Sequence, residues 1–220
     1  MILQSTFDFL TDLIANNNRD WFQANKERYN EARENVIDFT AAWLKQMHVI
    51  DPSIDETLDP KKCVMRIYRD IRFRKDKTPY KNNFGVSIPT NGTKLGRAEY
   101  YFQVSPGNSF IAGGYWMPEA EHLKKIRQEI DYNAAELEKI IDAPEFISLF
   151  GEFRQQEKLK TVPREYGADN EHIELLKLKS FVAFRNLKDK DLLLKSAVAD
   201  VAEVCRKIYP LNVFLNNALA

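Results

Sequence analysis

The apolar residues of this 220-residue chain recur with two different periods, and the change between them limits the folds that it can adopt. From about Asp20 to Met47, large apolar side chains recur every three, four or seven residues, which is typical of an amphipathic helix. Between residues 64 and 115, apolar and polar side chains alternate instead, as they do in half-buried strands. From residue 118 the helical spacing returns. These periods predict an α+β fold.

The alternating segments predict an antiparallel sheet of about five strands, flanked by N-terminal, middle and C-terminal helices. Ser5 or Thr6 is expected to cap the first helix, and Asn16–Asn18 to end it and offer the next cap. Pro210 is expected to end the last helix, because proline breaks a helix interior. The expected helices cover about 5–15, 20–47, 118–141, 144–150, 171–177 and 189–210. The expected strands cover 64–73, 84–88, 99–104, 110–115 and 178–184, with a hairpin tip at 92–96.

Composition narrows the class of protein further. With 44% hydrophobic residues the chain has material for a core, and it has no apolar run of 18 residues that could cross a membrane. Asp8 and Asp12 stand where a signal peptide would be apolar. Cys63 and Cys205 are expected to be free thiols in a reducing compartment. No linker is evident, so we expect a single α+β domain over residues 1–220, located in the cytoplasm.

Charge is balanced over the whole chain but concentrated in one segment. Lys and Arg number 32, as do Asp and Glu. Residues 61–81, KKCVMRIYRDIRFRKDKTPYK, contain nine basic and two acidic residues, a net charge of +7, so the rest of the chain carries −7. Zero net charge argues against non-specific adhesion of the whole protein to nucleic acids or membranes. The local excess indicates a focused anion site.

Like charges on a strand repel one another. Neighbours on one strand face are roughly 6.8 Å apart, where two unit charges repel by about 2.4 kcal/mol at an effective dielectric constant of about 20. One face of the expected strand 64–73 carries Arg66, Tyr68, Asp70 and Arg72. Arg69 is expected on the apolar face, either in a buried salt bridge or at a sheet edge. Two interpretations stay open. Either an anionic ligand compensates the excess, or acids from the rest of the chain pair with it.

The first interpretation gives a candidate binding site. Arginine donates two parallel hydrogen bonds to phosphate or carboxylate, which suits Arg66 and Arg72. Lysines of the following loop would add positive charge, and a tyrosine ring would stack on a base or sugar. The candidate ligand-binding residues are Arg66, Tyr68, Asp70, Arg72, Lys75, Lys77, Tyr80 and Lys81.

The sheet is expected to supply a polar floor beside these residues. Its members lie on the less apolar faces of their strands: Gly85, Ser87, Tyr101, Gln103 and Gly113.

Three functions remain open. The first is binding of phosphate, a nucleotide or nucleic acid through the basic segment. The second is an enzyme acting on a phosphorylated or nucleic-acid substrate, with Asp70 as base or metal ligand and Arg72 stabilising charge in the transition state. The third is an interaction scaffold that docks an acidic partner. His48, His122 and His172 lack ligand spacing, so no metal site is expected, and neither a cofactor nor an oligomeric state can be named.

RIYRDIRFRKDKTPYKNNFG (66–85) resembles the most recognisable motif of an uncharacterised family, domain of unknown function 2461. NNNRDWFQANKERY (16–29), PGNSFIAGGYWMPEAEHLKKIRQEI (106–130) and VPREYGADNEHIELLKLKSF (162–181) are similar to its other blocks, in the same order. Arg74 stands where the family usually has serine, and Glu171-His172 also departs from its pattern. The resemblance spans roughly residues 5–210 and implies a single domain, but it supplies no activity, cofactor or active site.

Overall fold

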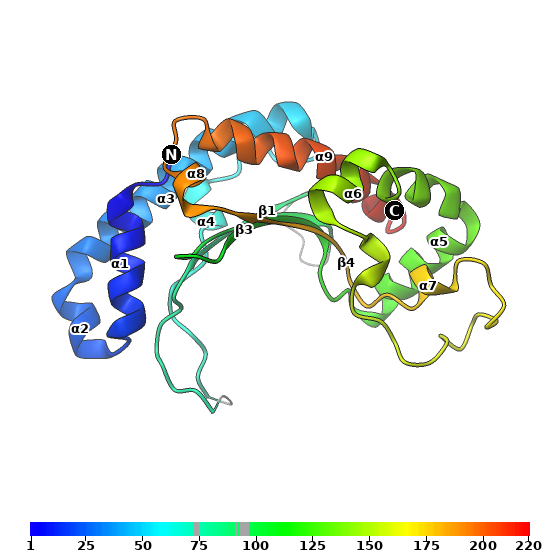
Figure 1. The fold of residues 1–220 in the computed structure, drawn as a ribbon, viewed down its shortest axis with the longest axis horizontal. Helices are drawn as coiled ribbons and strands as arrows, with labels where there is room; N and C mark the ends of the chain where they lie inside the picture. The colour runs from blue at the N-terminus through cyan, green and yellow to red at the C-terminus, as the bar shows by residue number, and fades with distance from the viewer. Residues whose placement is uncertain (73–74, 91, 93–96) are drawn as a thin grey trace.

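The computed structural model describes residues 1–72, 75–90, 92 and 97–220. These residues contain one antiparallel sheet in the order β1-β2-β3-β4, with helices from the N-terminal, middle and C-terminal parts of the chain around it (Figure 1). The α+β prediction is confirmed, with four strands instead of about five. The strands are β1 (Phe84–Pro89), β2 (Glu99–Val104), β3 (Ser109–Tyr115) and β4 (Phe181–Leu187).

The N-terminal helices are α1 (Gln4–Ala15), α2 (Arg19–Ala24) and α3 (Lys26–Ile50). Asn18 caps α2 as expected, since its side chain accepts a 2.9 Å hydrogen bond from the Trp21 amide. The cap predicted at Ser5 or Thr6 is wrong, because α1 begins after Leu3 and Thr6 is buried. The long helix predicted from Asp20 is interrupted at Asn25, so that α2 and α3 are separate.

The remaining helices are α4 (Pro60–Cys63), α5 (Ala120–Ile141), α6 (Pro144–Phe150), η1 (Phe153–Gln155, a 3-10 turn), α7 (Ile173–Leu176), α8 (Asp189–Leu192) and α9 (Ala197–Asn217). The prediction that Pro210 ends the last helix is wrong, because α9 continues past it. Pro210 is exposed, and its neighbours Ile208 and Leu211 are fully buried and hold the helix on the core. In the described part of the chain, no helix is both long and apolar enough to cross a membrane.

The two faces of the sheet differ in what covers them. Helices α3 and α9 cross one face (Figure 1), where Phe102 stacks on Phe39 with ring centroids 5.0 Å apart. Gly113 also lies on this covered face, because a Cβ there would come within 2.5 Å of Ile208 Cγ2 in α9. Its predicted place in the polar floor is therefore wrong. We call the opposite side, which carries Tyr101 and the partly exposed side chains around it, the open face.

The first and last strands of the predicted sheet differ from the structure. β4 begins at Phe181 rather than 178. The predicted strand 64–73 is wrong, because in the described part of it only isolated bridges form, Val64 with Val86 and Tyr68 with Tyr80. Val64 and Ile67 are buried at a spacing of three, and Met65 between them is 40% exposed, so the alternation does not hold.

Residues 64–72 and 75–81 instead form the two halves of an irregular hairpin, which we call the arm. Backbone hydrogen bonds join its two halves, from Arg69 N to Pro79 O at 2.9 Å and from Lys81 N to Ile67 O at 2.7 Å. A third bond, from Met65 N to Gly85 O at 2.8 Å, joins the arm to β1. The arm projects from the sheet on the side away from α3 and α9, next to α1 and α2 (Figure 1).

Candidate anion-binding site

Two contacts from the α1–α2 region hold the arm against the rest of the protein. The Asn17 side-chain amide donates to Tyr80 O at 3.0 Å and accepts from Tyr80 N at 3.1 Å. The Tyr80 ring stacks on Phe22, with centroids 4.0 Å apart and an interplanar angle of 14°. Tyr80 is only 4% exposed, so its ring anchors the arm, whereas Tyr68 beside it is 46% exposed.

Both acidic residues of the 61–81 segment pair with arginines of the same segment. Arg69 lies 2.6 Å from Asp76, so the expected salt bridge is present, but it is not buried, because the Asp76 side chain is 58% exposed. Hydrogen bonds from the Thr78 amide, from Arg69 and from the Thr78 hydroxyl lower the pKa of Asp76 to about 2. Arg72 donates to Asp70 from Nε at 3.0 Å and from Nη2 at 2.6 Å, and this pair raises the pKa of Arg72.

The other cations that the structure describes in this segment lack such pairing. Within residues 1–72, 75–90, 92 and 97–220, no acid from outside the segment forms an ion pair with it. The Lys77 ammonium donates to Ile71 O at 2.9 Å, a backbone contact that leaves its charge in place. Among the described residues, the basic side chains without an ion pair are Lys61, Lys62, Arg66, Lys75, Lys77 and Lys81.

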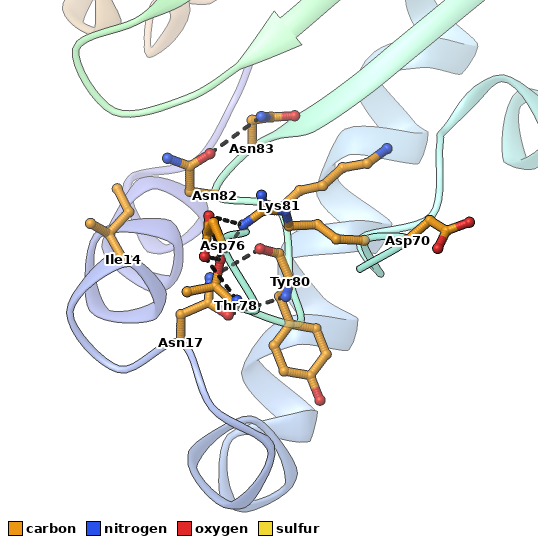
Figure 2. A pocket seen from close by; sticks show the side chains of 10 residues that line it. Ile14, Asn17, Asp70, Asp76, Thr78, Tyr80, Lys81, Asn82 and Asn83 are labelled. Atoms are coloured by element: carbon orange, nitrogen blue, oxygen red, sulfur yellow. Dashed lines mark hydrogen bonds and ion pairs between the residues drawn. The ribbon is translucent and has the colours of Figure 1, made fainter. Parts of the chain in front are cut away.

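A pocket of about 520 Å³ lies between the arm and the end of α1. Its lining residues are Ile14, Asn17, Arg69, Asp70, Asp76, Thr78, Tyr80, Lys81, Asn82 and Asn83. Figure 2 shows the Lys81 side chain extending away from Asp76 and Thr78, with the Tyr80 ring turned to the opposite side. Lys81 is half-buried, and this burial together with the nearby charge of Arg66 lowers the pKa of its ammonium group. The pocket lining thus includes a lysine whose charged form is destabilised by its surroundings.

Three of the predicted ligand-binding residues line this pocket, namely Asp70, Tyr80 and Lys81. The other five are in the arm but not in the lining: Arg66, Tyr68, Arg72, Lys75 and Lys77. Phe73 and Arg74 lie outside the described residues, as does most of the hairpin tip predicted at 92–96.

Sequence reasoning missed the asparagines of the pocket. Asn82 and Asn83 directly follow Lys81, and their amides offer hydrogen-bond donors at the pocket wall. The sequence signal was present, because the run Lys-Asn-Asn stands inside the quoted motif 66–85. In the described part of the chain, no three His, Cys, Asp or Glu side chains gather as a metal site would require.

The family comparison agrees with the motifs. The family model described as conserved hypothetical protein (DUF2461) matches residues 5–214. The chain belongs to this family. Two blocks of the DUF2461 resemblance meet at the pocket, since 16–29 supplies Asn17 and Phe22 and 66–85 supplies the Tyr80 that they hold. Searches of curated proteins and of solved structures returned no match.

Proposed function

We propose that this DUF2461 protein binds a phosphate-containing anion at the pocket beside the arm, with Lys81 and Arg66 as the principal cations. The observation that carries the proposal is the pairing pattern. Both acids of the segment are taken by Arg69 and Arg72, and among the described residues Lys81 and Arg66 have no carboxylate partner. An anion bound between Lys81 and Arg66 would offset the repulsion between their two charges. It would also offset the free-energy cost of burying the charged Lys81 side chain.

The pocket wall offers neutral donors to complete such a site. The side chains of Asn82 and Asn83 stand next to Lys81 in the lining, and an oxyanion accepts hydrogen bonds from amides as well as from ammonium groups. Arg72 is held by Asp70, so we expect it to add positive charge at a distance. Tyr68 is 46% exposed, and its ring centroid lies 5.4 Å from that of Tyr80.

Binding is better supported than catalysis at this pocket. The pKa of Asp76 is about 2, so this carboxylate stays ionised at neutral pH and is a weak base. Asp70 is hydrogen-bonded to Arg72. We further propose that residues 1–220 act as one domain in the cytoplasm, since Cys63 and Cys205 are both free and buried.

Calorimetric titration with pyrophosphate tests the proposal. At low salt we expect wild-type protein to bind, with an affinity that falls as sodium chloride is raised, because exposed charges are screened. Lys81→Gln should lose about tenfold or more in affinity, since a charge-assisted hydrogen bond is lost. The matched control is Lys124→Gln, which removes an exposed lysine from α5 at the other end of the molecule. No binding by wild type, or equal binding by Lys81→Gln, would contradict the proposal.

A further inference from the structure

Three aromatic side chains form a continuous row across the open face. The Tyr101 and Phe110 ring centroids are 5.5 Å apart, and those of Phe110 and Phe184 are 4.7 Å apart. The three residues come from adjacent strands, β2, β3 and β4. Phe184 is 42% exposed, and Tyr101 and Phe110 are partly exposed. Aromatic rings of the covered face, by contrast, are buried under α3 and α9, so this row is available to a ligand.

The row leads toward the arm. Gly85 lies under the end of Tyr101, since a Cβ at Gly85 would come within 2.6 Å of the Tyr101 hydroxyl. Gly85 is hydrogen-bonded to Met65 at the base of the arm and is two residues from Asn83 in the pocket wall. The aromatic row therefore begins next to the base of the arm. Figure 1 shows the arm on the side of the sheet opposite to α3 and α9.

A carboxylate stands at each end of the β2–β3 hairpin: Glu99 away from the arm, and Asp189 at the arm end, where it accepts a hydrogen bond from the Gly107 amide at 2.7 Å. Glu99, at the end of β2 away from the arm, accepts a hydrogen bond from Ser87 and is half-buried. Gln103, at the other end of the same strand, faces the turn that precedes β3, where it donates to Asn108 O at 3.1 Å. We therefore expect phosphate groups to be drawn by the cations of the arm and not by the sheet itself.

We propose that the open face binds single-stranded nucleic acid, with bases stacked on Tyr101, Phe110 and Phe184 and phosphates at the cations of the arm. This inference rests on the proposed function, because it uses the same arm for the phosphates. Flat rings on an open sheet stack on unpaired bases, whose faces a duplex hides. The cations of the arm match a phosphate backbone, which a neutral sugar or an apolar peptide lacks.

The test is fluorescence anisotropy with a labelled single-stranded octanucleotide. We expect Phe184→Leu to weaken binding by about tenfold, because leucine keeps the apolar volume but lacks the ring face on which a base stacks. The same variant should bind pyrophosphate as wild type does. Tyr132→Leu is the matched control, since Tyr132 is 82% exposed on α5, away from the open face. Its octanucleotide affinity should equal that of wild type.

The outcomes separate this inference from the proposed function. If wild type binds pyrophosphate but not the octanucleotide, or if Phe184→Leu binds it as tightly as wild type does, the inference is overturned while the proposed function stands. Equal affinity for a duplex of the same sequence, or for a mononucleotide, also overturns it. If wild type binds neither pyrophosphate nor the octanucleotide, both proposals fail.

Discussion

The arm and the segment 138–179 both carry many charges, but they differ in how those charges are compensated. In the second region, ion pairs join residues that are distant in the sequence. Arg154 lies 3.0 Å from Glu138 and also contacts Asp142, and Lys158 lies 2.6 Å from Glu174. In the arm, the described ion pairs join residues only two or seven positions apart, Arg72 with Asp70 and Arg69 with Asp76.

Under the proposed function, cations that pair with acids of the chain stabilise the fold, and cations without such partners would pair with a ligand. The chain has acids enough to neutralise the arm, since 32 acidic residues match 32 basic ones. The fold nevertheless leaves Lys81 and Arg66 without an acidic partner among the described residues, beside a pocket. The arm is held in place by Tyr80 and Asn17 rather than by its charges.

The largest expected effect comes from removing this anchor. Tyr80→Ala should lower the free energy of unfolding by about 3 kcal/mol, because it empties the buried contact with Phe22. Urea denaturation measures the change. Tyr132→Ala, at an 82% exposed site, should stay within about 0.5 kcal/mol of wild type. If the two variants were equally stable, the arm would not be anchored by Tyr80.

Removing one charge from each region tests the comparison itself. Arg154→Gln should cost about 1 kcal/mol at low salt, because it leaves Glu138 and Asp142 without their shared partner. Lys75→Gln should change the free energy of unfolding by less than about 0.5 kcal/mol, because the described residues provide no ion pair for it to lose. Equal losses in both variants would show that the arm is compensated like the other region.

A smaller effect with the opposite sign is expected at Lys81. Because burial and Arg66 lower its pKa, the charged ammonium costs stability at neutral pH, and this cost disappears as pH rises through the lowered pKa. Lys81→Met should therefore raise the Tm by about 1 °C at pH 7 while weakening pyrophosphate binding. The gain should shrink toward pH 10. A lower Tm at pH 7 would mean that Lys81 has a stabilising partner.

The smallest effect is a pH dependence within the arm. Since the pKa of Asp76 falls from 3.8 to about 2 on folding, its carboxylate stabilises the protein above pH 4, and the contribution is lost as pH falls toward 2. The stability difference between wild type and Asp76→Asn should follow the same course in acid titrations monitored by urea denaturation. A difference that is unchanged at pH 2 would contradict this account.

The sequence predicted the helices and three central strands well, because their apolar spacing reflects one dominant buried face. It failed at the arm, where Val64 and Ile67 are buried by an irregular hairpin and not by a sheet. It also failed at Pro210. The buried residues of α9 before and after this proline outweigh the loss of the backbone hydrogen bond that proline cannot donate.

The candidate site was predicted in part. The basic segment was evident from its composition, and Lys81 lines the pocket. The anchoring role of Tyr80 depends on Asn17 and Phe22, which are about 60 residues away in the chain. The aromatic row on the open face likewise depends on the register of β2, β3 and β4, which no single stretch of sequence specifies.

A crystal structure of the protein grown with pyrophosphate would show whether Lys81 and Arg66 bind an anion at the pocket. We expect the anion in the pocket, with an oxygen within hydrogen-bond distance of Lys81 Nζ and with Arg66 close enough to neutralise it. An empty pocket at a saturating pyrophosphate concentration, with Lys81 and Arg66 each paired to a carboxylate of the protein, would contradict the account.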